Sequence, residues 1–363
     1  MKRFVVMLGS DFSSPGGVTA VLRSYRAAKL FQRWPVVFLP TYKRDATVDK
    51  LLTAGVALMR FIGWLLAGRV AAVHAHTAAR ASFWRKSAFL LLGGLAGART
   101  ILHLHDGSFP AYYRETCGGL RRWAIRAILG RMDRVVVLSP GWLATIQAIQ
   151  PAARFEVIAN PVTTISGPPA PQPGEILFLG RLSPEKGILD LIDASAALAS
   201  EFPGLRLVCA GDGDIASLRY RAAALGLKHN VVFPGWVDGP AKDGLLARAS
   251  IFVLPSYAEG LPIGVLEAMI NGIPVVASAV GGIPDALGGE AGLLVPPGDP
   301  AALAAALATL LRSSELRRRM GSAGRRRAEA CYAPDKVLVR IGELYLGLGI
   351  QPTASGHPLL EAV

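Results

Sequence analysis

Two basic side chains with a fixed spacing mark one segment of this sequence as a place where an anion could bind. Residues 180–187 read Gly-Arg-Leu-Ser-Pro-Glu-Lys-Gly, follow a short apolar run and precede a helical pattern. Arg181 and Lys186 could converge there on one anion, and the first turn of a helix adds unpaired N–H groups. This combination suits a diphosphate, including the charge that grows on it when a sugar leaves. A solvated turn between a strand and a helix is the alternative.

Two carboxylates eight residues apart form the second candidate. Glu259 lies in a predicted loop and Glu267 about one turn inside a predicted helix, since Pro262 suits the first turn of a helix. Such a pair could contact two parts of one ligand, such as the hydroxyl groups of a sugar and of a ribose. The alternative is an exposed Glu259 and a Glu267 that only carries charge on a helix face. The N–H groups expected to point at the ligand's phosphate belong to Leu261, Ile263 and Gly264.

A double glycine after the first apolar run is a weaker phosphate-binding candidate. Gly16 and Gly17 enter a predicted helix, so backbone N–H groups could approach a phosphate there. Their spacing differs from the G-x-G-x-x-G pattern of dinucleotide-binding folds. We therefore expect phosphate binding at these glycines without expecting a dinucleotide.

Four of the six histidines lie at the carboxyl ends of two predicted strands, with His74 and His76 on one and His103 and His105 on the next. Alternate residues of a strand share a face, so an H-x-H metal pair is one interpretation. No clear third ligand follows in the sequence, and we predict no metal site. We expect His105 to contact a sugar, whereas His74 and His103 are expected to be ordinary loop histidines.

All these candidates stand where short apolar runs end and helical patterns begin. This alternation predicts parallel sheets with helices on both faces, in an α/β protein with two Rossmann-like domains. Residues 168–174 are rich in proline and predict a linker between a first domain at 1–167 and a second at 175–332. Residues 351–363 predict a loose tail. The predicted strands are 4–8, 36–39, 70–74, 100–104, 134–138, 155–158, 175–179, 205–210, 231–233, 251–254 and 275–278, and the predicted helices of the second half are 188–201, 215–225, 263–271 and 300–312.

Charge is distributed unevenly along the chain. Residues 1–170 contain 22 Lys and Arg against 7 Asp and Glu, a net charge of +15, whereas residues 171–363 contain 17 against 19, a net charge of −2. Five of the six tryptophans also lie in the first half. A basic, tryptophan-rich half predicts an anionic partner, such as a membrane surface, a lipid diphosphate or nucleic acid. A genome that favours arginine is the alternative explanation.

The apolar runs are too short for a signal peptide or a membrane span. Residues 4–8 are only five apolar residues, 56–67 are interrupted by Arg60, and 88–98 are about half of the roughly 20 residues that a span needs. The two longer runs therefore predict helices with one apolar face. Three widely separated cysteines favour a reducing compartment. We expect a cytoplasmic protein, with peripheral contact at the inner face of the plasma membrane as a further expectation.

In their order along nearly the whole chain, the motifs resemble those of glycosyltransferase family 4, whose members are retaining enzymes with the GT-B fold. The most specific element is the pair Glu259 and Glu267 followed by Ala268-Met269. The resemblance implies two Rossmann-like domains that face a central cleft, with a C-terminal helix at about 333–350 that returns to the first domain. The other matching segments are 16–17, 105–106, 137–139, 157–161, 180–187, 211–213, 233–237, 272–276, 281–284 and 292–295.

The resemblance also implies chemistry and residue roles. Members of the family generally need no metal, so we expect no metal and no cofactor, with the nucleotide sugar as a substrate. The departing phosphate is thought to assist deprotonation of the acceptor, so Glu259 would act as an electrostatic and positioning group. The implied catalytic residues are Glu259, His105, Arg181 and Lys186, where His105 and Glu259 contact the donor sugar; the diphosphate is held by Arg181 and Lys186 and approached by Gly16 and Gly17, and Glu267 binds the ribose.

Residues 74–87 resemble the acceptor-binding domain of bacterial polysaccharide-building members of the family. A compact basic and aromatic element lies there, and we expect it to contact a polyprenyl-diphosphate-linked saccharide and the membrane surface. A helix with an ordinary basic face is the alternative. The element consists of Arg80, Trp84, Arg85 and Lys86.

The sequence thus predicts a retaining hexosyltransferase that uses GDP-mannose or a UDP-sugar in cell-surface polysaccharide synthesis, with no nucleic acid as a partner. One alternative is a sugar-nucleotide epimerase, which should lack the two-glutamate element. Another is a non-catalytic protein of the same fold that binds a sugar nucleotide. The intact pairs Arg181 with Lys186 and Glu259 with Glu267 argue against that second alternative.

Overall fold

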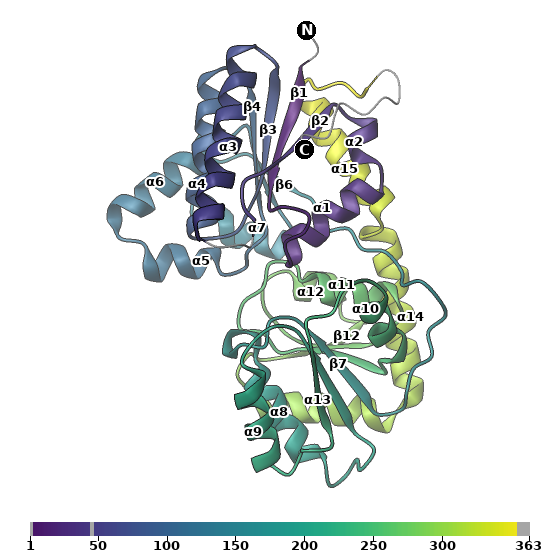
Figure 1. Cartoon of the computed structure of the whole chain (residues 1–363). Coiled ribbons are helices and arrows are strands. Elements are labelled where there is room, and N and C mark those ends of the chain that lie inside the picture. The colour runs from purple at the N-terminus through teal and green to yellow at the C-terminus, as the bar shows by residue number, and fades with distance from the viewer. Residues whose placement is uncertain (1–2, 44–46, 354–363) are drawn as a thin grey trace. The chain divides into compact units, whose positions relative to one another are not determined.

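The computed structural model describes residues 3–43 and 47–353, and the chain forms two compact units. The first unit comprises residues 1–161 and 334–363, and the second comprises 162–333. Each unit is a parallel sheet covered by helices (Figure 1). The α/β class and the two Rossmann-like units predicted from the sequence are confirmed.

In the first unit, six parallel strands lie in the order β2-β1-β3-β4-β5-β6. Their inner strands are buried along nearly their whole length because helices cover both faces of the sheet, which is why they read as unbroken apolar runs. The strands are β1 (Phe4–Gly9), β2 (Val36–Pro40), β3 (Val70–Thr77), β4 (Arg99–Leu104), β5 (Arg134–Val137) and β6 (Phe155–Val157). The helices are α1 (Gly17–Ala27), α2 (Leu30–Arg33), α3 (Thr47–Leu66), α4 (Ala81–Leu95), α5 (Phe109–Ala111), the π turn η1 (Tyr112–Thr116), α6 (Gly119–Arg131), α7 (Pro140–Gln147) and α15 (Pro334–Gly347).

Neighbouring residues of β3 show which helices cover which face of this sheet. The backbone of α4 lies against Val73, since a Cβ added at Gly93 would lie 2.6 Å from a Val73 methyl group. The next residue, His74, is bonded instead to Tyr345 of α15. Successive side chains of a strand point to opposite faces. Helices α3 and α4 therefore cover one face of the sheet and α15 the other, as Figure 1 also shows.

In the second unit, six parallel strands lie in the order β12-β11-β10-β7-β8-β9. The chain moves outward from β7 to β9 and then resumes at β10 on the other side of β7, so the strand order reverses between β7 and β10. The strands are β7 (Glu175–Leu179), β8 (Arg206–Ala210), β9 (Val231–Gly235), β10 (Ile251–Leu254), β11 (Val275–Ser278) and β12 (Gly292–Val295). The helices are the 3-10 turn η2 (Pro184–Lys186), α8 (Ile188–Leu198), α9 (Ile215–Ala224), α10 (Gly239–Arg248), α11 (Ile263–Ile270), α12 (Ile283–Leu287), α13 (Pro300–Arg312) and α14 (Ser314–Cys331).

The structure differs from the sequence predictions at several boundaries. It divides the chain after Pro161, and the proline-rich residues 168–174 belong to the second unit. There the N–H of Ala170 bonds to the carbonyl of Ala247, and that of Gln172 to the carbonyl of Arg248, so this segment runs along the end of α10. Strand β3 extends to Thr77, three residues beyond the prediction, and β12 was not predicted.

The chain end belongs to the first unit. Helix α15 packs there through Tyr345, whose ring lies 5.3 Å from that of Trp34. Most of the predicted tail at 351–363 lies outside the described residues. Within the described part of the chain, no helix combines the length and apolar character needed to cross a bilayer.

Candidate active site

The strand order of the second unit creates a crevice where the sequence placed most of its candidates. Open α/β sheets bind ligands outside the carboxyl ends of their strands, where the strand order reverses. Here that point lies between β7 and β10, which pair through Ile176 with Ile251 and Leu177 with Phe252. Arg181 and Lys186 follow β7, and both glutamates follow β10. The topology therefore gathers side chains that are about 80 residues apart in the sequence.

An ion pair joins the two loops at this point. The Nζ of Lys186 donates to Oε1 of Glu259 at 2.5 Å, and the buried hydroxyl of Ser256 donates to the same oxygen at 2.8 Å. The Glu259 residue is 8% exposed, whereas the Lys186 side chain is about one-third exposed. The carboxylate is thus fixed in place while the ammonium group stays accessible to a ligand.

Two glycines allow the backbone to approach closely enough for this pair. Gly187 has φ of 69°, and a Cβ there would lie 2.0 Å from the carbonyl oxygen of Pro255. Gly281 has φ of 57°, and a Cβ there would lie 1.8 Å from the carbonyl oxygen of Glu259. Only glycine fits such contacts at these backbone angles. Gly187 thus allows Lys186 to approach the loop after β10. Gly281 packs against the backbone carbonyl of Glu259.

Arg181 lies on the exposed side of the same crevice. Its charge and that of Lys186 both act on Glu185, whose pKa is lowered mainly by the hydrogen bond from Ser183, next by a backbone hydrogen bond, and further by these two cations. Both cations thus act on one carboxylate, and their convergence on a ligand stays a prediction. Together with the first turn of α11, they suit a diphosphate.

Helix α11 presents its amino terminus to this crevice and carries the second carboxylate. A Cβ at Gly264 would lie 3.0 Å from the ring of Phe252 and 3.5 Å from the carbonyl oxygen of Leu179, so α11 begins close to the end of β7. Leu261 and Ile263 flank Pro262, which precedes the helix. The N–H groups of the first helical turn lack helical partners and are available to an anion.

Glu267 is held by a lysine that the sequence did not single out. The Nζ of Lys242, on α10, donates to Oε1 of Glu267 at 2.6 Å. Burial raises the pKa of Glu267, and the neighbouring charge of Lys242 partly offsets that effect. No local sequence signal pointed to Lys242, because the pair is closed by the packing of α10 against the rest of the unit.

In the first unit, the strand order reverses between β1 and β3, and the remaining candidates follow these strands and β4. Gly16 and Gly17 are exposed at the start of α1, and Gly16 has φ of 133°. The loop after β4 is tied to the loop after β3 by Asp106, whose carboxylate accepts from the N–H of Ala79 at 3.0 Å and of Ser108 at 2.9 Å. The structure thus gives Asp106 a positioning role.

The four histidines form one cluster of stacked imidazole rings. Nε2 of His74 lies 3.2 Å from Nδ1 of His103, and Nδ1 of His76 lies 2.9 Å from Nε2 of His105. Nδ1 of His74 reaches the hydroxyl of Tyr345 at 2.9 Å. His74, His76 and His103 are buried and His105 is partly exposed, so the prediction of ordinary loop histidines at His74 and His103 is wrong. These two residues lie within strands, because β3 continues to Thr77 and β4 to Leu104.

The electrostatics of the cluster favour neutral imidazoles. Burial lowers the pKa of His74 to about 3 and holds the pKa of His76 and His103 well below the usual range. One nitrogen of each of His74, His76 and His103 lies within 4.8 Å of the others, which is close enough to consider a metal. However, the neighbouring cation is Lys86, which bonds to the carbonyl of His76 and the hydroxyl of Ser82, and no carboxylate pairs with it among the described residues. A buried divalent cation there would lack a compensating charge.

The basic and aromatic element of α4 divides into an exposed part and a buried part. Arg80 is exposed, with φ of 59°, and its guanidinium lies over the ring of Tyr112. Trp84 donates from Nε1 to the hydroxyl of Tyr112 at 2.9 Å, and Arg85 is half-buried. Lys86 is only 2% exposed and donates to the carbonyl of His76. Its burial rules out the predicted contact of Lys86 with a membrane surface, because its backbone position directs it inward.

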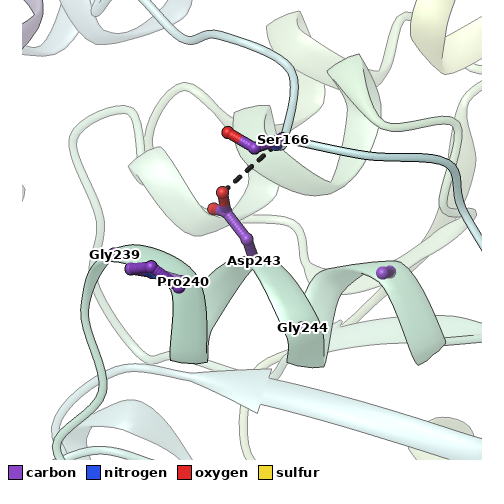
Figure 2. Close-up of a pocket in the computed structure, with 6 residues that line it drawn as sticks. Ser166, Gly239, Pro240, Asp243 and Gly244 are labelled. Atoms are coloured by element: carbon purple, nitrogen blue, oxygen red, sulfur yellow. Dashed lines mark hydrogen bonds between the residues drawn. The ribbon is translucent and has the colours of Figure 1, made fainter.

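A hollow of about 390 Å³ lies elsewhere in the second unit, beside the start of α10 (Figure 2). The N–H of Ser166 donates there to Oδ2 of Asp243 at 3.2 Å. Its polar groups therefore satisfy one another. None of the predicted site residues lines this hollow, whose lining residues are Ser166, Gly239, Pro240, Asp243, Gly244 and Ala247.

Comparisons with known sequences divide the chain in nearly the same way. The family described as Glycosyl transferases group 1 matches residues 166–327, and the family described as Glycosyl transferase 4-like domain matches residues 16–161. The phosphatidyl-myo-inositol mannosyltransferase of Mycobacterium leprae is 41% identical over 152 residues, which cover 41% of this chain and 40% of that protein. The match thus spans well under half the length of this curated relative.

Two solved structures share the fold over almost their whole length. Sucrose-phosphate synthase from Thermosynechococcus elongatus superposes with a TM-score of 0.77 at 22% identity, covering 96% of this chain and 99% of that one. Anabaena HepE in complex with UDP and glucose superposes with a TM-score of 0.76 at 20% identity, covering 95% and 99%. At this identity the likeness concerns the fold.

Proposed function

Because this chain belongs to the GT-B glycosyltransferases of family 4, we propose that it transfers a sugar from a nucleotide-sugar donor to an acceptor with retention of configuration. The observation that carries this proposal is the pair Lys186–Glu259, which lies at the point of strand-order reversal beside Arg181. It combines a fixed carboxylate for sugar hydroxyl groups with accessible cations for a diphosphate.

The reaction needs no protein nucleophile. The bond between the sugar C1 and the phosphate oxygen breaks, the acceptor oxygen bonds to C1 on the same face, and the acceptor proton passes to the departing phosphate. Arg181, Lys186 and the first turn of α11 stabilise the charge on the leaving diphosphate. Glu259 orients the donor sugar and Glu267 binds the ribose. The products are the glycosylated acceptor and a nucleoside diphosphate.

We propose the same roles for the first-unit residues as the resemblance implied, namely diphosphate contact for Gly16 and Gly17 and contact with the donor sugar for His105. The position of His105 directly after β4, with Nε2 bonded to Nδ1 of His76, supports this assignment. We further propose that the reaction proceeds without a metal, because two cations and a helix terminus supply positive charge at the diphosphate.

The donor is proposed to be GDP-mannose or a UDP-sugar, and the acceptor a lipid-linked saccharide used in cell-surface polysaccharide synthesis. Arg80 supports an anionic acceptor, because it is exposed and holds a strained backbone angle next to Trp84. Arg85 adds a second, half-buried cation on α4, whose guanidinium lies over the ring of Tyr42. Lys86 is too deeply buried to join them at the surface.

The proposal is tested by thermal unfolding of the purified chain with UDP, GDP, ADP and their sugars, in the presence of EDTA. A nucleotide at about 100 times its dissociation constant should stabilise the protein by roughly 2.7 kcal/mol. We expect a response to one nucleotide without metal, followed by transfer from its sugar to an acceptor. NAD is the control ligand and should have no effect.

Failure would take two distinguishable forms. A response only after Mg²⁺ or Mn²⁺ is added would refute metal independence while leaving the donor site in place. No response under either condition, in a protein that is shown to be folded, would remove the basis for sugar transfer.

A further inference from the structure

Helices α3 and α4 carry apolar side chains on the side that faces away from the sheet. On α3 the exposed residues Val56, Met59 and Leu66 follow one another at helical spacing, and Leu66 is 85% exposed. On α4 the exposed Leu91, Leu92 and Leu95 do the same, and Leu95 is 87% exposed. Leucines at such exposure, gathered rather than scattered, indicate an interaction surface.

The two apolar faces lie side by side. Phe61 of α3 and Phe89 of α4 are buried against each other with ring centroids 5.2 Å apart, and Phe61 also approaches Gly93. The two helices cover the same face of the sheet (Figure 1). Their outward sides are therefore neighbours on the same face of the first unit, and we call them together the α3–α4 surface.

Arginines border the α3–α4 surface where the two most exposed leucines lie. Leu66 and Leu95 end α3 and α4, and these helices lead into β3 and β4, so both leucines lie at the edge where the parallel strands begin. Arg3, Arg69 and Arg99 stand at the starts of three neighbouring strands on that same edge. Arg3 is fixed there by its hydrogen bond to the carbonyl of Gly68.

This region contains almost no negative charge. Residues 52–69 and 81–99 include neither aspartate nor glutamate. Asp133 lies close by and pairs with Arg99 at 3.1 Å, so these two charges offset each other and the net positive charge of the border comes from Arg3 and Arg69. Apolar side chains bordered by arginines complement the head groups and acyl chains of an anionic bilayer.

A second copy of the chain fits this surface less well. A symmetric dimer would bring the same patch from each copy together and would therefore place the arginine borders near each other. Lipid head groups instead supply the opposite charge. Because α4 begins beside Arg80 and ends at Leu95, a bilayer lying along it would also reach the exposed arginine that we assign to the acceptor.

We propose that the first unit docks on anionic lipid through the α3–α4 surface. This inference deepens the proposed use of a lipid-linked acceptor by naming the surface that meets the membrane. It also corrects the sequence prediction, which placed that contact partly on the buried Lys86.

The test is co-sedimentation of the full chain with phosphatidylcholine vesicles that contain, or lack, about one-third phosphatidylglycerol. We expect binding to the anionic vesicles, weaker binding at high salt, and at least about tenfold weaker binding for the double variant Leu66→Glu, Leu95→Glu. The matched control is Val339→Glu, Leu346→Glu, which adds the same two charges at exposed apolar residues of α15 on the other face of the sheet and should bind like wild type.

Three results would overturn the proposal: no binding of the wild type to anionic vesicles, unchanged binding of the α3–α4 variant, or equal loss in the α15 control. Light scattering that shows a dimer, lost in the α3–α4 variant, without vesicle binding would assign the surface to a second copy. Vesicle binding is measured without donor, and thermal stabilisation by nucleotide should persist in the α3–α4 variant. Failure of the docking proposal is thereby separable from failure of the transferase proposal.

Discussion

The two units handle buried charge in opposite ways. In the second unit, the carboxylates of the candidate site are each paired with a lysine, Glu259 with Lys186 and Glu267 with Lys242. In the first unit, the buried polar groups at the corresponding edge are imidazoles, and Lys86 has no carboxylate partner among the described residues. One edge is built from paired charges and the other from neutral rings beside Lys86, a cation that lacks a carboxylate partner in the described part of the chain.

This difference matches two kinds of ligand. A carboxylate and a lysine that are paired can each exchange partners with a charged donor, whereas burial of a cation without a carboxylate partner favours the loss of its proton. Burial lowers the pKa of Lys86 to about 7, with the nearby charge of Arg85 as a second cause. The surroundings of Lys86 in the first unit thus suit hydrogen bonding with neutral groups, whereas the charged pairs of the second unit suit a diphosphate.

The largest expected effect comes from breaking the balanced pair. Lys186→Met and Glu259→Gln should each lower kcat/KM for sugar transfer by about 100- to 1000-fold, because both act on charge or geometry in the transition state. The double variant should be little worse than either single one, since the residues act as a unit. Release of nucleoside diphosphate is the measurement. Arg318→Met, which removes an exposed pair with Glu315, is the control and should leave the rate unchanged.

The next effect concerns the unpaired lysine. The folded pKa of Lys86 lies near 7, below the value of about 10.4 expected in the unfolded chain, so the unfolded state binds more protons between these values. Stability should therefore rise as pH increases from about 7 to about 10, and the penalty is fully present below pH 7. Lys86→Met should remove this rise and stabilise the protein at pH 7 by up to about 4 kcal/mol, because the pKa difference at 1.36 kcal/mol per unit is partly offset by the lost hydrogen bonds to His76 and Ser82.

Chemical denaturation of both proteins at several pH values checks this prediction. Parallel stability profiles for wild type and Lys86→Met would show that Lys86 keeps its charge when folded, and the contrast between the two units would then disappear. Lys336→Met, at an exposed lysine of the same unit, is the matched control.

A smaller effect separates binding from stability at the second carboxylate. Burial raises the pKa of Glu267, which means that the negative charge of this carboxylate does not stabilise the folded chain. Glu267→Gln should weaken donor binding about 10- to 100-fold by removing charge-assisted hydrogen bonds to ribose, while the free energy of unfolding changes by less than about 1 kcal/mol. Calorimetric titration and denaturation measure the two quantities. Strong destabilisation with unchanged donor affinity would assign the Lys242–Glu267 pair to structure instead.

The smallest effect tests the neutral cluster. Tyr345→Phe leaves Nδ1 of His74 without its partner and should cost about 1 kcal/mol of stability. Tyr25→Phe is a close control, because the buried hydroxyl of Tyr25 has no hydrogen-bond partner and its removal should cost nothing. Equal losses in the two variants would show that ring packing, and not the bond to His74, holds α15 in place.

Much of the candidate site was predictable because its parts are local in the sequence. Arg181 and Lys186 share one loop, and Glu259 and Glu267 share one loop and helix, so spacing alone indicated which segments would carry the candidate groups. Alternating apolar runs predicted ten of the sheet positions within a residue or two of their observed ends, because buried parallel strands need unbroken apolar stretches. The exception was β3, whose continuation through His74, His76 and Thr77 is polar.

The pairings between distant segments were not predictable. Lys186 and Glu259 are 73 residues apart, and Lys242 and Glu267 are 25 residues apart. The local sequence around each of these residues does not indicate its partner. The proline-rich residues 168–174 likewise indicated an open linker, whereas backbone hydrogen bonds attach them to the end of α10. Such contacts depend on the order in which strands assemble.

The sequence by itself determined the two Rossmann-like units, the loops that carry the cations and carboxylates, and the excess of positive charge in the first half. Only the tertiary structure decided that Lys86 points inward, that the four histidines stack, and that α3 and α4 keep a second apolar side exposed. The physical reason is that sequence periodicity shows only which sides of a helix are apolar. Which of these sides is buried depends on the elements that pack against the helix, and they lie far away along the chain.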